Sequence, residues 1–309
     1  MNYRVLGRTG LRVSTLSFGG APLGSAYGPT TQEQSTAAVH AALDAGINFF
    51  DTAPYYGATT AETALGHALA GVPRDQFILA TKVGRYGLDQ FDFSAARVTA
   101  SVDESLARLQ CEHLDLIQVH DLEFGRLDQI VNETLPALDA LRASGKVRFV
   151  GITGLPLRAL TVAHSFWPAD TVLSYCHYCL HDTTLAAAAP AWRERKSGVI
   201  NASPLAMGLL SDAGPPDWHP APAALRDACY AAAGFCRAQG RSLAELALQF
   251  ALADSPADTT LVGMRTAAEV ALNVAAAAAA PDRGFIATLQ QRLAPVRNRT
   301  WPSGLPENN

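Results

Sequence analysis

The feature of this sequence that most constrains its fold is a regular alternation of two patterns. Short runs rich in apolar, β-branched or aromatic residues alternate with longer stretches whose apolar residues recur at helical spacing. The candidate strands are residues 15–18, 47–51, 77–82, 114–120, 147–153, 171–175, 198–203 and 259–263. Helical stretches include residues 32–45, 94–109, 127–144 and 242–252. Eight strand–helix units without a linker-like stretch predict a single (β/α)8 TIM barrel domain over residues 1–309.

The main alternative fold is an open, doubly wound sheet, which usually carries a G-x-G-x-x-G fingerprint in its first βα turn. The corresponding segment here, "SFGGAPLG", contains glycines but lacks that fingerprint. Ahead of the barrel, "YRVLGRTGLRVS" at residues 3–14 predicts an N-terminal β-hairpin. The alanine-rich run 273–281 predicts the end of a helix, and the tail from about residue 295 is expected to fold back over the barrel or to fray.

Charge and hydropathy limit the partners that the chain can have. Its formal net charge is −4 and its basic residues are scattered, which argues against nucleic acid or an anionic membrane surface as a partner. No segment resembles a signal peptide, and no apolar run reaches the length of about 18 residues that a membrane span needs. The sequence therefore predicts a cytoplasmic protein with a small-molecule partner, as a monomer or a small homo-oligomer.

Five cysteines are unevenly spaced and do not predict a disulfide framework. They are Cys111, Cys176, Cys179, Cys229 and Cys236. The "CHYC" pair could be half of a metal site or a redox pair, but no second ligand pair follows it at metal spacing. We therefore interpret the cysteines as packing residues and predict no metal site.

Four polar residues stand at or just after the ends of consecutive predicted strands: Asp51, Tyr56, Lys82 and His120. Catalytic groups of a (β/α)8 barrel project from this end of its strands. An ammonium lowers the pKa of a nearby phenol, so Lys82 would favour the phenolate of Tyr56, and Asp51 would keep Lys82 charged and in place. His120 would orient a substrate oxygen. Each residue alone could be a loop cap, a solvated charge or a core residue, but the set favours a catalytic site.

With these residues the sequence resembles the aldo-keto reductase superfamily over nearly its whole length. The tetrad of that superfamily falls on Asp51, Tyr56, Lys82 and His120 in "FDTAPYYG", "LATKVG" and "QVHD", and the opening "LGRTGLRVSTLSFGG" is also typical. Further stretches, such as "GKVRFVGITGLPL" and "SPLAMGLL", are most similar to the L-galactose dehydrogenase branch. The resemblance implies a nicotinamide-dependent oxidoreductase that transfers hydride from C1 of L-galactose or L-fucose, with the tyrosine as general acid and base.

The cofactor residues of the superfamily match this sequence unevenly. Its usual Ser-Asn pair for the nicotinamide carboxamide is replaced by Thr153 and Gly154, and Ala202 stands where many members have a stacking aromatic residue. The resemblance implies cofactor contacts at Tyr175, Ser203, Leu205, Gly208, Leu210, Gly263, Met264, Arg265, Glu269 and Asn273. The positions from Gly263 to Asn273 in this list could instead belong to an ordinary helix start. Because Glu269 would repel a 2′-phosphate, NAD is expected, although Arg265 leaves NADP possible.

Residues of the long βα loops could frame a sugar, which binds through polar groups beside aromatic rings. The candidates are Tyr86, Asp121, Glu123, Phe124, Tyr175, His177, Trp218 and Trp301. Each could instead be a loop-packing residue. Two other enzyme functions remain open, a general NADPH-dependent carbonyl reductase and a pyridoxal-type dehydrogenase. A barrel without enzymatic function, as in potassium-channel β subunits, is a further alternative.

Overall fold

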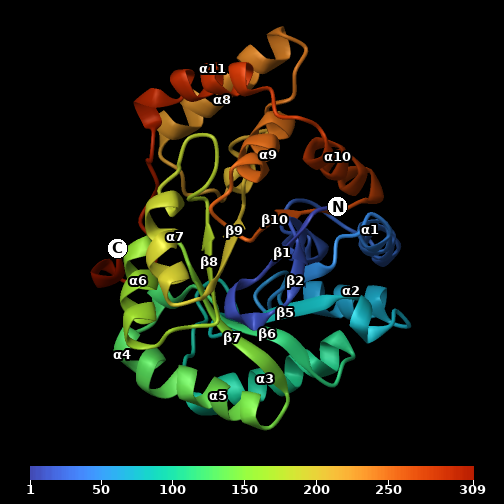
Figure 1. Ribbon diagram of the computed structural model, residues 1–309, viewed down its shortest axis with the longest axis vertical. Helices are drawn as coiled ribbons and strands as arrows, with labels where there is room; N and C mark the ends of the chain where they lie inside the picture. Colours follow the sequence, from blue (N-terminus) through green and yellow to red (C-terminus); the bar gives the residue numbers. More distant parts are fainter.

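The structure, a computed structural model that describes residues 1–309, is built around a closed barrel of eight parallel strands (Figure 1). Each strand pairs with its neighbour in the sequence, and the last strand pairs with the first, which closes the barrel. The strands are β3 (Leu16–Gly19), β4 (Phe49–Asp51), β5 (Ile78–Val83), β6 (Leu114–Val119), β7 (Val147–Gly154), β8 (Thr171–Tyr175), β9 (Gly198–Ala202) and β10 (Thr259–Gly263). All eight lie where the sequence predicts them, so the predicted (β/α)8 fold is confirmed.

Helices surround the barrel, and α8 and α11 extend it at one end (Figure 1). Their bounds are α1 (Gln32–Asp44), α2 (Thr60–Leu69), α3 (Ala95–Leu109), α4 (Leu127–Gln129), α5 (Leu135–Ala143), α6 (Leu157–Phe166), α7 (Leu185–Glu194), α8 (Ala223–Ala238), α9 (Leu243–Ala253), α10 (Ala267–Ala278) and α11 (Arg283–Arg292). The stretch predicted as one helix over 127–144 contains a π-helical segment, Ile130–Thr134. Pro136 follows it and has no N–H to donate to the carbonyl four residues earlier, which accounts for the irregular turn.

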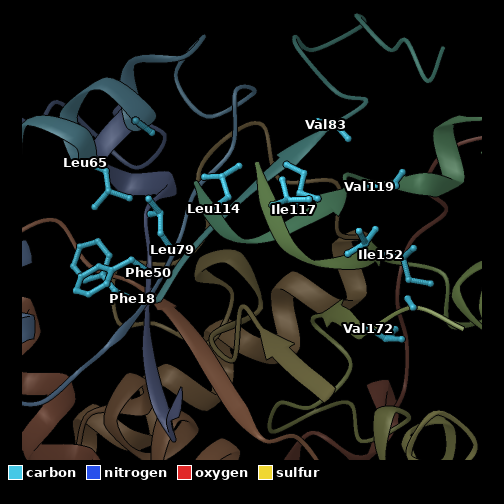
Figure 2. Packing of buried hydrophobic residues seen from close by; sticks show 14 of the residues in the cluster. Phe18, Phe50, Leu65, Leu79, Val83, Leu114, Ile117, Val119, Ile152 and Val172 are labelled. Atoms are coloured by element: carbon cyan, nitrogen blue, oxygen red, sulfur yellow. The ribbon is translucent and has the colours of Figure 1, made fainter. Parts of the chain in front are cut away.

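The strand pleat separates two of the three hydrophobic clusters of the core, and the third lies among α8, α9, α11 and the tail. Outward side chains such as Phe18, Phe50 and Leu79 pack against the surrounding helices, where they meet Leu65 of α2 (Figure 2). Inward side chains form a second cluster inside the barrel, which includes Phe49, Ile78, Leu116, Leu173 and Ile200. The predicted hairpin is confirmed: β1 (Tyr3–Val5) pairs antiparallel with β2 (Arg12–Ser14). Its Leu6, Leu11 and Val13 join the inward cluster and close the end of the barrel where the strands begin.

The C-terminal tail folds back onto the opposite end of the barrel. Trp301 is buried, and Asn308 donates a hydrogen bond of 2.8 Å from Nδ2 to the carbonyl oxygen of Glu123, which follows β6. Of the two alternatives that the sequence leaves for this tail, the structure shows the docked one. All five cysteines are free thiols, and none of the helices has the length and apolar character needed to span a membrane.

Candidate active site

The strand pleat that directs apolar side chains into the barrel interior also directs polar side chains inward at the strand ends. Every second side chain of a strand points inward, so each inward apolar position is followed two residues later by another inward position. At the carboxyl ends of β4, β5 and β6 these later positions hold Asp51, Lys82 and Gln118, and His120 follows β6 at the next inward position. Lys82 is in register with Gln118 on the neighbouring strand. The apolar inner layer thus ends in a layer of polar groups.

Lys82 is the centre of this polar layer. Its Nζ donates hydrogen bonds to the carboxylate of Asp51, to the carbonyl oxygen of Thr52 at 2.8 Å and to the hydroxyl of Tyr56 at 3.3 Å. Asp51 is fixed from its other side, because Gln118 Nε2 donates to Asp51 Oδ2 at 2.8 Å. Lys82 and Asp51 are both buried. Water is therefore largely excluded from the ion pair, which makes its interactions stronger than they would be in solution.

The loop after β4 brings Tyr56 to this lysine. The chain turns at Ala53–Gly57, where the backbone N–H of Tyr56 donates to the carbonyl of Ala53 and Gly57 adopts a positive φ of 60°. The Tyr56 ring meets His120 edge-on, with ring centroids 5.5 Å apart. Nδ1 of His120 is buried without a hydrogen-bond partner in the protein. The four residues predicted as a catalytic set therefore lie together, with a phenol and an imidazole side by side.

Burial controls how the groups of this cluster titrate. It raises the pKa of Tyr56 above the ordinary value, and although the charge and hydrogen bond of Lys82 act to lower it, they do not outweigh burial and the nearby carboxylates. The net direction is thus opposite to the effect expected of Lys82 alone. Burial by itself would lower the pKa of Lys82, but Asp51 and Tyr56 raise it, so Lys82 remains an ammonium. Burial lowers the pKa of His120 to about 3, so its ring is neutral.

Two residues of the cluster were not identified from the sequence. Gln118 holds Asp51, and the signal that could have found it is its place two residues before His120 on the same face of a strand. Arg85, two residues past β5, forms an ion pair with Asp121 and lies over the ring of Tyr55, 3.8 Å from its centroid. Only the position of Arg85 just after a strand end pointed to this contact.

A cavity of about 920 Å³ opens over this cluster and collects many of the predicted residues. Those that line it are Asp51, Tyr56, Lys82, Tyr86, His120, Asp121, Phe124, Thr153, Tyr175, Ser203, Trp218, Gly263 and Trp301. They come from the ends of seven strands, from the loop after β9 and from the C-terminal tail. Barrel closure therefore brings together residues that are up to 250 positions apart in the sequence, between Asp51 and Trp301.

Other predicted cofactor residues do not line the cavity. These residues are Gly154, Leu205, Gly208, Leu210, Met264, Arg265, Glu269 and Asn273. The side chains of Leu210 and Met264 are fully buried in hydrophobic clusters, so they act as packing residues in this structure. Arg265 and Glu269 form an ion pair at the start of α10, with Nη2 of Arg265 2.9 Å from Oε1 of Glu269.

Glu123 and His177 lie behind the cavity wall instead of in the predicted sugar-binding surface. Glu123 Oε1 accepts hydrogen bonds from Leu155 N at 3.1 Å and Ser303 Oγ at 2.8 Å. A Cβ at Gly154 would lie 2.5 Å from Glu123 Oε2, so the glycine leaves room for this carboxyl group. Burial raises the pKa of Glu123 to about 8. His177 contacts the carbonyl of Leu155 through Nε2, so both residues secure loops behind the wall.

Comparison with known proteins agrees with this geometry. The model of the "Aldo/keto reductase family" matches residues 15–293. The chain belongs to the aldo/keto reductase family. This aldo/keto reductase is 48% identical to the L-galactose dehydrogenase of Arabidopsis thaliana over 314 residues, which cover 99% of the chain and 98% of that relative.

A more distant relative and a solved structure extend the comparison. The D-threo-aldose 1-dehydrogenase of a Pseudomonas species is 31% identical over 317 residues and covers 93% of this aldo/keto reductase and 96% of the relative. The holo form of an aldo-keto reductase from Bacillus halodurans superposes with a TM-score of 0.79 at 29% identity, and covers 98% of the chain and 99% of that structure. Fold and family thus agree with the expectation from the sequence.

Proposed function

We propose that this aldo/keto reductase is an aldose 1-dehydrogenase that oxidises the C1 hydroxyl of L-galactose or L-fucose to the aldonolactone. The proposal rests above all on the buried cluster of Asp51, Tyr56, Lys82 and His120 on the cavity wall. The 48% identity to an L-galactose dehydrogenase supports the choice of sugar. A polar cluster at the carboxyl ends of barrel strands is also the usual position of a catalytic site in this fold.

In the proposed reaction, Tyr56 takes the proton of the C1 hydroxyl. The phenolate that this step requires is costly in a buried site, and Lys82 reduces the cost because its ammonium lies 3.3 Å from the phenol oxygen. Asp51 keeps Lys82 charged and in place. The neutral ring of His120 can hydrogen-bond the substrate oxygen and orient it toward Tyr56. Because oxidation needs the deprotonated phenol, its rate is expected to increase toward alkaline pH.

The cavity wall fits a nicotinamide dinucleotide, which when bound supplies the acceptor for the hydride from C1. The volume of about 920 Å³ is large enough for a drug-sized ligand. Its wall extends from His120 to Ser203 and Gly263 at the ends of β9 and β10. Tyr175 is in register with Ala202, the position at which many family members carry the stacking ring. Thr153, Tyr175 and Ser203 would hold the nicotinamide half.

The contacts of Arg265 favour NAD over NADP in this proposal. Nε and Nη2 of Arg265 both donate to Oε1 of Glu269, at 3.1 and 2.9 Å, while Nη1 donates to the carbonyl of Tyr27 at 2.8 Å. A ribose 2′-phosphate would have to displace Glu269 from this guanidinium, whereas a ribose hydroxyl could donate to Glu269. Glu269 also accepts from the backbone N–H of Arg265, so it has a structural role as well.

A sugar panel tests the substrate. Purified protein is incubated with NAD and each sugar while the absorbance of the reduced nicotinamide is followed. L-Galactose and L-fucose should both be oxidised, and D-galactose and D-glucose should be poor substrates. Equal rates with D- and L-galactose would contradict the sugar assignment. Activity confined to NADPH-dependent reduction of simple aldehydes would instead favour a general carbonyl reductase.

Glu269→Gln tests the choice of dinucleotide. Removing the charge that engages Arg265 should increase the relative catalytic efficiency with NADP about tenfold or more, which corresponds to about 1.4 kcal/mol. Glu245→Gln is a matched control, because Glu245 holds the same third position of helix α9, where its N–H is also capped by a serine or threonine. A wild-type protein that prefers NADP tenfold would show that Arg265 outweighs Glu269.

A further inference from the structure

Arg85 is a cation inside the cavity that the proposed reaction does not use. It follows Gly84, whose φ of 100° turns the chain sharply after β5, and its side chain is only 14% exposed. Three aromatic rings surround its guanidinium: Tyr55 at 3.8 Å, and Phe91 and Phe124 at 5.3 Å each. Such contacts hold a planar guanidinium in a defined orientation. Arg85 is therefore a preorganised group on the cavity wall and not a solvated surface charge.

Asp121 fixes the position of Arg85 relative to the catalytic cluster. Nη1 of Arg85 donates to Oδ2 of Asp121, and the same oxygen lies 3.6 Å from Nε2 of His120. The backbone of Asp121 has a positive φ of 50°, and its N–H donates to Thr153 Oγ1 at 3.2 Å. This conformation is uncommon for a residue other than glycine. The chain thus holds Asp121 between Arg85 and His120 at a conformational cost.

The pair offers unused hydrogen-bonding capacity to the cavity. Nε of Arg85 is buried, but of the two terminal nitrogens of the guanidinium the protein engages only Nη1, which leaves Nη2 as a free donor. Asp121 Oδ1 makes no hydrogen bond within the chain, and both residues line the cavity. Donors and an acceptor at fixed spacing match neighbouring hydroxyl groups, each of which both donates and accepts. Since Asp121 already neutralises Arg85, the pair suits a neutral polyol better than an acid.

We propose that Arg85, held by Asp121, is a specificity-determining residue that reads the hydroxyl pattern of the sugar. This inference rests on the proposed function, and it names the residue that distinguishes an aldose from a simple alcohol or aldehyde. A site built to hydrogen-bond a hydroxyl discriminates strongly against analogues that lack it, because its buried polar groups are then left unpaired. Arg85 acts on substrate choice, whereas the proton moves at Tyr56.

Monodeoxy sugars test this role. Catalytic efficiency is measured for the wild type and for Arg85→Met with L-galactose and with its 2-, 3-, 4- and 6-deoxy analogues. The wild type should lose about 10- to 100-fold with at least one analogue, as expected for a hydrogen bond to a charged group. The catalytic efficiency of Arg85→Met with L-galactose should be lower than that of the wild type by a similar factor. For this variant, the change from L-galactose to that analogue should cause no further loss. Arg97→Met is the matched control, because Arg97 lies over Tyr86 but outside the cavity.

Two further measurements separate recognition from a structural role. Arg85→Lys keeps the charge beside Asp121 but lacks the forked donors, so it should fold and still lose the discrimination. An equal loss by Arg85→Met on L-galactose and on every analogue would overturn the inference in favour of loop positioning. A wild type without activity on any aldose would overturn the proposed function and the inference with it. An active wild type whose preference survives in both Arg85 variants would overturn the inference alone.

Discussion

The two ends of the barrel use buried aspartates in different ways. At the end where the strands begin, Asp115, Asp170 and Asp258 each accept a hydrogen bond from a backbone N–H of the preceding strand. Each aspartate also pairs with arginines that are 28–49% exposed: both oxygens of Asp115 and Asp170 do so, and Oδ1 of Asp258. These groups therefore tie one strand to the next at the boundary with solvent. The arrangement stabilises the barrel without providing a site for a ligand.

At the carboxyl ends of the strands, the aspartates pair with cations inside the protein. The Lys82 side chain that faces Asp51 is 2% exposed, and the Arg85 side chain that faces Asp121 is 14% exposed. Removing both charges of a pair from water is costly, and the mutual attraction of the charges does not always repay it. Unpartnered polar atoms also remain here, namely Arg85 Nε and His120 Nδ1. Comparison of the two ends teaches that paired carboxylates connect strands at one end, whereas at the other they belong to a buried polar cluster that lines the cavity.

The largest expected effect is on turnover at the carboxyl end. Tyr56→Phe removes the proton-carrying hydroxyl, so kcat should decrease about 10²- to 10⁴-fold, while NAD binding and the melting temperature change little. Steady-state kinetics with L-galactose and a thermal melt measure these quantities. Tyr55→Phe is the control. The ring centroid of Tyr55 lies only 6.0 Å from that of Tyr56, but Lys82 donates its hydrogen bond to the hydroxyl of Tyr56 and not to that of Tyr55. Substantial turnover by Tyr56→Phe would move the role to another residue.

The next largest effect is expected at the end where the strands begin. There Asp170→Ala should affect stability and not turnover. It leaves the buried N–H of Val150 unpaired and separates Arg8 and Arg142 from their shared partner. The free energy of unfolding should decrease by about 2–4 kcal/mol, with kcat within about twofold of the wild type. Urea unfolding and kinetics on the same preparation measure both.

Asp128→Ala is the control for this prediction, because the ion pair of Asp128 with Arg126 is exposed. No measurable change in stability is expected for that variant. A selective loss of activity in Asp170→Ala, without a loss of stability, would contradict the division between the two ends.

The smallest expected effect concerns Glu123, where the carboxyl end meets the tail. Its pKa is raised in the folded protein to about 8, so the folded state holds this proton more tightly than the unfolded chain. The stability that Glu123 contributes is therefore complete below its unfolded pKa of about 4.3 and is lost as pH increases toward 8. Glu123→Gln should flatten this dependence and increase the melting temperature above pH 8 relative to the wild type.

Thermal melts at pH values about one unit apart between pH 4 and pH 9 test the direction of this dependence. Glu133→Gln is the control, because Glu133 is partly exposed and accepts a hydrogen bond from Ala95 N. An unchanged pH dependence in Glu123→Gln would show that Glu123 is ionised in the folded protein.

Much of the fold and the grouping of the candidate catalytic residues could be predicted from the sequence, because both depend on local patterns. A period of two along β4, β5 and β6 determines which residues face inward, so the strand ends identified Asp51, Lys82 and His120. Tyr56 lies in the loop after β4, and the family motif "FDTAPYYG" supported its inclusion in the set. The eight strands and the hairpin were predictable for the same reason, since their apolar runs and turn residues are local signals.

Only the tertiary structure decided the contacts between residues that are distant in the sequence. Barrel closure sets Gln118 beside Asp51 and Arg85 beside Asp121, and the docking of the tail sets Ser303 beside Glu123, which removes Glu123 from the cavity wall. It also decided how the groups titrate. Lys82 lowers the pKa of Tyr56 as its charge requires, but the net direction depends on how much water the fold excludes, and no local pattern encodes that amount.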